Sequence, residues 1–250
     1  MEWMKTRGNY VRRYDEYYTT KEHVEYIFKN YLNQISLKGK IIYSPCDSEK
    51  SEFVKYIKAH KDELQYKEYI YTSDDYNTHL DLFDYCDIVI TNPPFSKIIK
   101  EFIPILNNCK KEFFILGSLI NIWCYYDHFG DKENIKFERP AKMFPFNCPD
   151  PNLSNTPLYI YMYNIQCIKS PKNKLILGPD KGKEIYLYGI KNYDKLRWIP
   201  EDIDEEILVP STVLLEQNRY LFDIIKNGIR DKTTGKYIRI LVKKKKKSSL

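Results

Sequence analysis

The sequence predicts an α/β protein with a mostly parallel central sheet flanked by helices. The clearest observation is the unbroken apolar run Ile88-Val89-Ile90, which is typical of a strand buried on both faces of a parallel sheet. A second is the succession of apolar strand, polar turn and amphipathic helix between Ile41 and His60. A third is another buried strand, Glu112–Gly117, that follows a helical pattern.

Composition favours an intracellular protein with a full hydrophobic core. The 250 residues are 43% hydrophobic, and we expect one domain with embellishments. No apolar run reaches the length of a membrane span, and the start of the chain has no signal-peptide pattern. Six scattered cysteines without a Cys-x-x-Cys pair and four separated histidines predict neither a disulfide framework nor a metal site. A cytoplasmic location in a bacterium, phage or mobile element is expected, and a monomer is plausible.

The N-terminal part begins with a basic arm, residues 1–17, which precedes the core expected over 18–165. Thr19 or Thr20 is suited to cap a helix, and apolar residues then recur at helical spacing. We therefore predict an amphipathic helix from about Lys21 to Gln34.

A strand–turn–helix unit follows. Ile41–Tyr43 is a short apolar strand, Ser44–Ser51 is a polar turn, and a helix runs from about Ser51 to His60. Such a unit opens the N-terminus of its helix to a ligand. The turn has no glycine, which counts against the phosphate loops that bind NAD or ATP.

The next predicted strand, Glu68–Tyr71, ends at two acidic residues, Asp74 and Asp75. A carboxylate there can accept hydrogen bonds from ribose hydroxyls or an adenine amine, and a solvated turn is the equally weighted alternative. Beyond the central strand, we expect a helix over Ile98–Leu106 that is broken or kinked near Pro104.

The pattern changes after Gly117. Residues 118–156 form a long proline- and asparagine-rich region within the core, and loops of that length are usually functional. Leu158–Ile165 alternates as a strand returning to the sheet. Residues 166–242 make a C-terminal extension packed on the core, with a late hairpin whose turn is Asn227-Gly228 or Thr234-Gly235.

Charge is concentrated at the end of the chain. The net charge is +6, and Lys243–Lys247 contributes five of the positive charges, so the rest of the chain is close to neutral. We expect 243–250 to be a disordered basic tail, with contact to DNA phosphates as the less favoured reading.

The central strand leads into Asn92-Pro93-Pro94-Phe95. The prolines cannot donate ladder hydrogen bonds, so they end the strand and leave a stiff polar loop at the carboxyl edge of the sheet. The Asn92 side-chain carbonyl and the Pro93 backbone carbonyl can accept both hydrogens of one amine. Phe95 offers a flat surface for a base. Such a loop suits an enzyme that alkylates a flipped-out base, whereas an ordinary turn is the plain alternative.

Several motifs in this order resemble the EcoRI-type adenine-specific DNA methyltransferases. They are Asp15–Thr20, Gly39–Asp47, Ser51–Tyr56, Cys86–Ser96, and the late segments Val209–Ser211 and Phe222–Ile224. The Asn-Pro-Pro-Phe loop is shared with amino-methyltransferases in general. Its combination with the glycine-free Pro45-Cys46-Asp47 turn narrows the resemblance to the EcoRI-type family.

The resemblance implies a Rossmann-like methyltransferase fold, S-adenosylmethionine as methyl donor, and adenine N6 in DNA as acceptor. It assigns the base-binding loop to Asn92, Pro93, Pro94 and Phe95. It assigns cofactor contacts to Tyr18, Thr19, Ser44, Pro45, Cys46, Asp47, Phe53, and either Asp74 or Asp75. It also implies that target recognition lies in 118–156 and after Ile165, where the match is poorest.

Two other readings stay open from the sequence. An RNA or a protein glutamine also presents an amino group that this kind of loop can bind. A catalytically degenerate nucleic-acid-binding module of the same fold is the non-enzymatic alternative, although every residue of the Asn92–Phe95 loop is present.

Overall fold

The computed structural model describes residues 17–95, 97–119, 124–125, 129, 134–140, 142–148, 158–169, 184–187, 190–193, 205–210, 222–230 and 238–244. The chain divides into two compact units. Unit 1 is Met1–Ser118 with Lys132–Lys174, and unit 2 is Leu119–Asp131 with Leu175–Leu250. Leu119–Asp131, expected inside the catalytic core, therefore groups with the C-terminal residues. Across the described ranges, no helix is long and apolar enough to cross a membrane.

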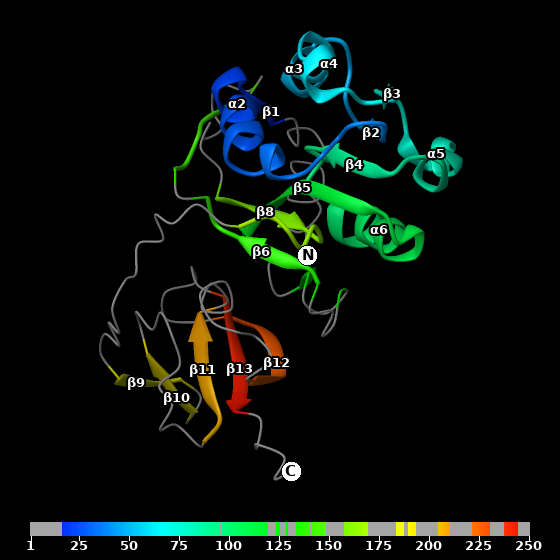
Figure 1. The fold of residues 1–250 in the computed structure, drawn as a ribbon. Helices are drawn as coiled ribbons and strands as arrows, with labels where there is room; N and C mark the ends of the chain where they lie inside the picture. The colour runs from blue at the N-terminus through cyan, green and yellow to red at the C-terminus, as the bar shows by residue number, and fades with distance from the viewer. Residues whose placement is uncertain are drawn as a thin grey trace. The chain divides into compact units, whose positions relative to one another are not determined.

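Unit 1 is built on a six-stranded sheet (Figure 1). In spatial order its strands are β3 (Glu68–Thr72), β2 (Ile41–Pro45), β4 (Ile88–Thr91), β5 (Glu112–Ser118), β8 (Tyr159–Tyr163) and β6 (Lys136–Glu138). The first four run parallel, and β8 is antiparallel to both β5 and β6. The predicted α/β class and mostly parallel sheet are confirmed.

The central strand β4 is buried on both faces, as its apolar run predicts. Ile88 and Ile90 point into a hydrophobic cluster that also contains Phe53 of helix α3 (Glu52–Ala59). On the opposite face Val89 pairs with Tyr43, whose ring meets Phe83 of helix α5 (Leu80–Tyr85) edge-on at 5.2 Å. Successive side chains of one strand thus reach helices in two different layers.

The helices of unit 1 are α2 (Lys21–Asn30), α3 (Glu52–Ala59), α4 (Lys61–Leu64), α5 (Leu80–Tyr85) and α6 (Ile103–Cys109), with single turns η1 (Leu32–Gln34) and η2 (Tyr76–His79). The helix expected to reach Gln34 leaves α geometry after Asn30 and ends as the 3₁₀ turn η1. The break expected near Pro104 is confirmed, because a π-helical segment η3 (Ile98–Phe102) gives way to α6 at Ile103. Pro104 lies in the first turn of α6, directly after the π-helical segment, and its missing N–H removes one helical hydrogen bond there.

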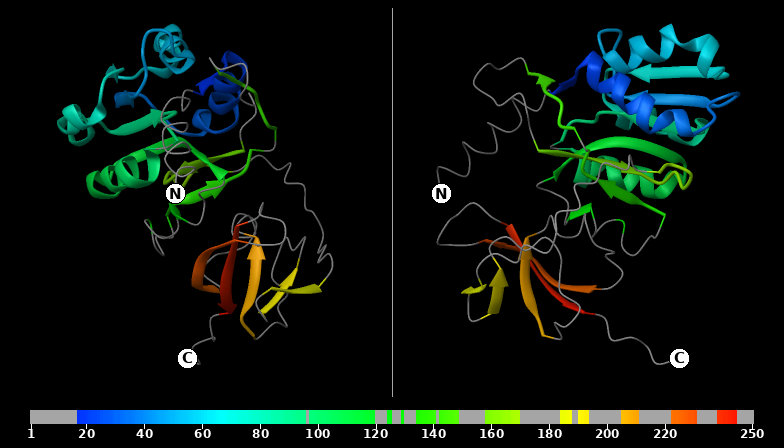
Figure 2. Two further views of the ribbon diagram at one scale, coloured as in Figure 1. Left: turned by 180° about the vertical axis from the view of Figure 1, so that it is seen from behind. Right: turned by 60° about the vertical axis from the view of Figure 1, so that its left-hand side comes forward.

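Unit 2 contains a five-stranded sheet in the order β12-β13-β11-β10-β9 (Figure 2). Its strands are β9 (Glu184–Leu187), β10 (Ile190–Tyr193), β11 (Ile207–Pro210), β12 (Phe222–Arg230) and β13 (Ile238–Lys244). The predicted late hairpin corresponds to the antiparallel pair β12–β13.

Two details of that hairpin differ from expectation. Asn227-Gly228 lies inside β12, where the register with β13 shifts, so it is a strand irregularity and not the turn. The other candidate, Thr234-Gly235, falls outside the described residues. Lys243 and Lys244 belong to β13 and pair with Asp223 and Phe222, so the strand takes in the first part of the expected disordered tail.

Candidate active site

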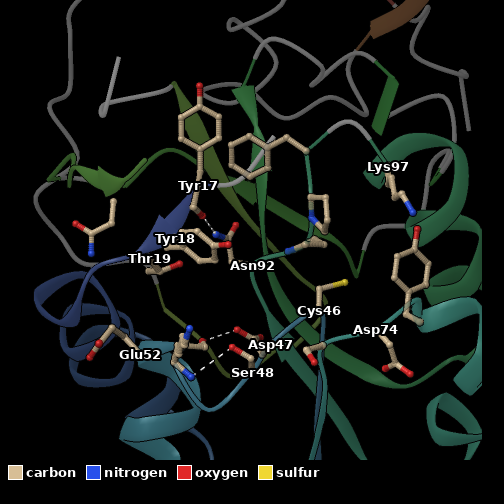
Figure 3. A pocket seen from close by; sticks show the side chains of 18 of the residues that line it. Tyr17, Tyr18, Thr19, Cys46, Asp47, Ser48, Glu52, Asp74, Asn92 and Lys97 are labelled. Carbon is tan, nitrogen blue, oxygen red and sulfur yellow. Dashed lines mark hydrogen bonds between the residues drawn. The ribbon is translucent and has the colours of Figure 1, made fainter. Parts of the chain in front are cut away.

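An open pocket of about 860 Å³ lies in unit 1 at the carboxyl ends of β2, β3 and β4 (Figure 3). Along the chain, β3 is added on one side of β2 and β4 on the other, so the strand order reverses between β2 and β4. Open α/β sheets bind ligands at such a reversal, because the loops that leave the two strands diverge there. The pocket therefore occupies the position where this topology favours a ligand.

The Asn92–Phe95 loop forms one wall of this pocket. The Asn92 Nδ2 atom donates a hydrogen bond to the backbone carbonyl of Tyr17 at 2.6 Å. Since a carbonyl oxygen only accepts, this bond fixes the amide with its nitrogen toward Tyr17. The other amide atom, Asn92 Oδ1, is buried without a hydrogen-bond partner. A buried acceptor left unpaired costs about 1–3 kcal/mol, which marks the position as one that a ligand donor can satisfy.

Aromatic rings line the same part of the pocket. The rings of Phe95 and Tyr17 are nearly parallel, with centroids 5.9 Å apart and an interplanar angle of 22°. Phe146 meets both of them edge-on, at 6.4 Å from Phe95 and 6.1 Å from Tyr17. Phe95 and Tyr17 are each half-buried, so flat apolar surface remains beside the amide of Asn92.

The turn after β2 contains Cys46 with a backbone φ of +67°. This left-handed conformation is the one that glycine adopts freely, so Cys46 occupies it in a turn that lacks glycine. Its side chain points into the pocket (Figure 3). Burial, together with the neighbouring Asp47 carboxyl, raises the pKa of the Cys46 thiol to about 12, so it is not an activated nucleophile.

Asp47 follows in the same turn and is almost fully buried, at 6% exposure. Ser51 Oγ donates to Asp47 Oδ1, and Thr91 Oγ1 lies 2.7 Å from Asp47 Oδ2. Burial raises the pKa of Asp47 to about 7, although both hydroxyl contacts act to lower it. The carboxyl group thus lies close to its titration point at neutral pH.

Three predicted cofactor residues lie behind the pocket and do not line it. Ser44 is fully buried and donates to the carbonyl of Ile90 at 2.6 Å. The carbonyl of Pro45 accepts a hydrogen bond from Thr91. Phe53 is fully buried in the hydrophobic cluster beneath the sheet. These residues support the pocket from β2 and α3, because in both elements their side chains face the core.

Asp74 and Asp75 both line the pocket after β3. Asp75 caps η2 by accepting from the Asn77 backbone N–H at 3.1 Å, which holds the pKa of its carboxyl below the usual value. Asp74 contacts His79 Nε2 at 2.8 Å, and this hydrogen bond likewise lowers its pKa. Both carboxylates are therefore charged hydrogen-bond acceptors at neutral pH.

Tyr18 and Thr19 form the short strand β1 (Tyr18–Thr19), which pairs with β7 (Phe146–Asn147). Thr19 is only 6% exposed, and its Oγ1 atom is buried without a hydrogen-bond partner. Tyr18 is 52% exposed at the pocket rim. Thr19 thus provides a second buried polar atom, besides Asn92 Oδ1, whose partner is missing.

Some pocket residues escape sequence reasoning. Tyr17 was placed in the N-terminal arm, and Asn147 in the long region after Gly117, yet both line the pocket. Lys97 also lines it, with its Nζ atom 5.7 Å from the centre of the Tyr76 ring. The doubled tyrosine before Thr19 is the one local signal for Tyr17; the pairing of β1 with β7 has none. Within the described ranges, no group of three His, Cys, Asp or Glu residues could hold a metal ion.

Comparison with known proteins gives one family match. The model of the family described as adenine-specific methyltransferase EcoRI matches residues 73–138, about a quarter of the chain. The matched segment includes Asp74, Asp75 and the whole Asn92–Phe95 loop. The match supports the resemblance that the motifs indicate, and it points to an adenine-specific methyltransferase. No curated protein matches the chain.

Proposed function

We propose that this chain transfers a methyl group from S-adenosylmethionine to the N6 amino group of adenine in DNA. The observation that carries the proposal is Asn92 Oδ1, an unpartnered buried acceptor in the same loop and pocket as Phe95, at the reversal in strand order. An amino group attached to a flat ring satisfies both features at once. The family match over this loop supports adenine as that ring.

The pocket residues fit the cofactor in chemical type. Asp74 or Asp75 offers charged acceptors for ribose hydroxyls, and the Thr19 hydroxyl needs a polar partner. The Cys46–Asp47 turn takes the place of a glycine-rich loop, and the fold in this proposal is Rossmann-like. When bound, S-adenosylmethionine supplies an electrophilic methyl group on a sulfonium.

Asn92 and Pro93 activate the amine in this account. The lone pair of an adenine amine is delocalised into the ring, which makes the nitrogen a poor nucleophile. Asn92 Oδ1 and the Pro93 carbonyl accept hydrogen bonds from the two N–H groups of the amine. These hydrogen bonds favour a pyramidal nitrogen and stabilise the positive charge that develops on it. The bond from Asn92 Nδ2 to Tyr17 holds that acceptor in place before the substrate arrives.

Phe95 positions the base. A base within a duplex cannot reach a buried amide, so the target adenine has to leave the stack, and its unstacking cost is offset by stacking on an aromatic side chain. Phe95 is three residues after Asn92, in a loop stiffened by two prolines, so ring and acceptor move as one body.

The test is an acceptor comparison. The wild-type protein is incubated with S-adenosylmethionine labelled on the methyl group and, in parallel, with unmethylated DNA, with RNA, and with a protein extract free of nucleic acid. Label in DNA alone is the expected result. Label in RNA or protein alone would overturn the choice of substrate, and failure to bind the cofactor in a titration would favour a degenerate binding module.

A further inference from the structure

Tyr17 contacts both functional ends of the loop that follows β4. Its backbone carbonyl accepts from Asn92 Nδ2, 75 positions later in the sequence. Its ring stacks on Phe95. Tyr17 therefore holds the amide of Asn92 and also covers one face of the Phe95 ring in the same loop.

The rings of Tyr17 and Phe95 have the arrangement of two walls of a slot. They are inclined by only 22°, and Phe146 stands edge-on to both, at 84° to Tyr17 and 74° to Phe95. Phe146 is 2% exposed and does not line the pocket, so it supports the two rings from the core side, whereas both rings retain exposed surface. A flat guest between near-parallel rings stacks on both of them, and an edge-on ring beneath closes the slot.

A base fits between the two rings only when they move apart. Stacked bases lie about 3.4 Å apart along one strand, so a base between two rings needs about 7 Å. The present separation of the centroids is 5.9 Å. The gap between the ring planes is no larger than this centroid distance, so a base enters only after the two side chains rotate apart. Such rotation leaves the hydrogen bond from Asn92 Nδ2 to the Tyr17 carbonyl intact.

We propose that Tyr17 is a positioning residue that forms the second wall of the target-base slot. The base enters between Tyr17 and Phe95 with its amino group at Asn92 Oδ1. This inference rests on the proposed function and adds a residue that neither the motifs nor the family match assign. The tyrosine ring acts on the acceptor base, and the cofactor does not contact it.

The experiment tests the effect of the Tyr17 ring separately from that of its backbone carbonyl. Tyr17→Ala and Tyr17→Leu remove the flat ring but keep the carbonyl that orients Asn92, and Tyr17→Phe keeps the ring as a matched control. For each variant, steady-state methylation of unmethylated DNA gives kcat and KM for DNA, and titration gives the affinity for S-adenosylmethionine. Thermal unfolding verifies that each variant is folded, and the leucine variant retains apolar volume if alanine unfolds the N-terminal segment.

The expected result is a fall in kcat/KM for DNA of about 10- to 100-fold in the alanine and leucine variants, the range of one lost base stack. Cofactor affinity should change less than about twofold, and Tyr17→Phe should behave as wild type. Unchanged kcat/KM in Tyr17→Leu, or a loss confined to cofactor affinity, would overturn the inference while leaving the proposed function intact. If the wild-type protein itself methylates no DNA, the proposed function fails and this inference falls with it.

Discussion

Thr91 Oγ1 lies 2.7 Å from Asp47 Oδ2, and this contact joins the residue before Asn92 to the turn after β2. The backbone pairing of β2 with β4 ends at Tyr43 and Val89, so the two strands separate toward the pocket. Ser44 bridges part of the gap by donating to the Ile90 carbonyl. Beyond the last backbone pair, side-chain hydrogen bonds therefore hold β2 and β4 together as they approach the site.

The Thr91 hydroxyl has one hydrogen but two acceptors beside it. Besides Asp47, it contacts the carbonyl of Pro45. If Thr91 donates to Pro45, the contact to Asp47 is satisfied when Asp47 itself carries a proton. The hydrogen-bonding pattern therefore agrees with the raised pKa of this buried carboxyl.

The stability of the protein should depend on pH through Asp47. Burial raises its folded-state pKa from 3.8 to about 7, so between these values the folded chain keeps a proton that the unfolded chain has lost. The stabilisation of the folded chain that comes from protonated Asp47 is complete below about pH 4 and is lost as the pH rises to about 7. Asp47→Asn mimics the protonated group, so its stability relative to wild type should increase from pH 5 to pH 8. From pH 5 to pH 8 this increase is at most about 3 kcal/mol, because only the two pH units between 5 and 7 contribute, at about 1.4 kcal/mol each.

Urea unfolding of both proteins across this pH range measures the difference. Asp84→Asn, at an exposed carboxylate of α5, is the matched control. The difference in unfolding free energy between this variant and the wild type should change little with pH. A difference between Asp47→Asn and wild type that stays constant from pH 5 to pH 8 would contradict a protonated Asp47.

Cys46 should tolerate glycine better than alanine. Both substitutions remove the thiol, but only glycine relieves the left-handed conformation, which costs other residues about 1–2 kcal/mol. Glycine loses part of that gain through its greater freedom in the unfolded chain, about 0.4–1 kcal/mol. We expect Cys46→Gly to exceed Cys46→Ala in unfolding free energy by up to about 1 kcal/mol.

Chemical denaturation of the two variants tests this order. The same pair of substitutions at Glu25, exposed within α2, should show the ordinary helical order with alanine more stable than glycine. If alanine also exceeds glycine at position 46, the turn does not impose the left-handed conformation on that residue.

Thr19→Val should separate stability from ligand binding. Valine keeps the shape of threonine and removes Oγ1, which is buried without a partner. The stability of the unliganded protein should stay level or rise by about 1 kcal/mol, while affinity for S-adenosylmethionine should fall about 5- to 10-fold, the effect of one lost hydrogen bond.

Calorimetric titration measures the affinity, and thermal unfolding measures the stability. Thr20→Val is the control, since the Thr20 side chain is outside the pocket lining and should leave cofactor affinity unchanged. Unaltered affinity in Thr19→Val would remove Thr19 from the cofactor site.

Local signals in the sequence predict the central strands of unit 1. Ile88–Ile90 predicts β4 because a strand covered on both faces has consecutive apolar residues, and the prolines after it predict where the strand ends. Asp74, Asp75 and the Asn92 loop were likewise predicted to sit at strand ends, and the parallel sheet brings them to one edge.

Other features depend on contacts between distant segments. Tyr17 reaches the pocket because β1 pairs with β7, which lies more than a hundred residues later. Ser44 and Phe53 neighbour pocket residues in sequence, yet the alternation of β2 and the helical phase of α3 turn them to the core. Asn227-Gly228 matches a turn dipeptide, but the residues on either side of it, Lys226 and Ile229, pair with β13 and keep it in β12.

The central claim is that Asn92 Oδ1 binds the adenine amino group during methyl transfer. Its most direct test is nucleoside analysis of unmethylated DNA after incubation with S-adenosylmethionine and either the wild-type protein or Asn92→Ala. The account predicts N6-methyladenine with the wild type and a loss of at least about 100-fold in the variant, whose cofactor affinity should be retained. Equal amounts of N6-methyladenine from the two proteins would contradict it.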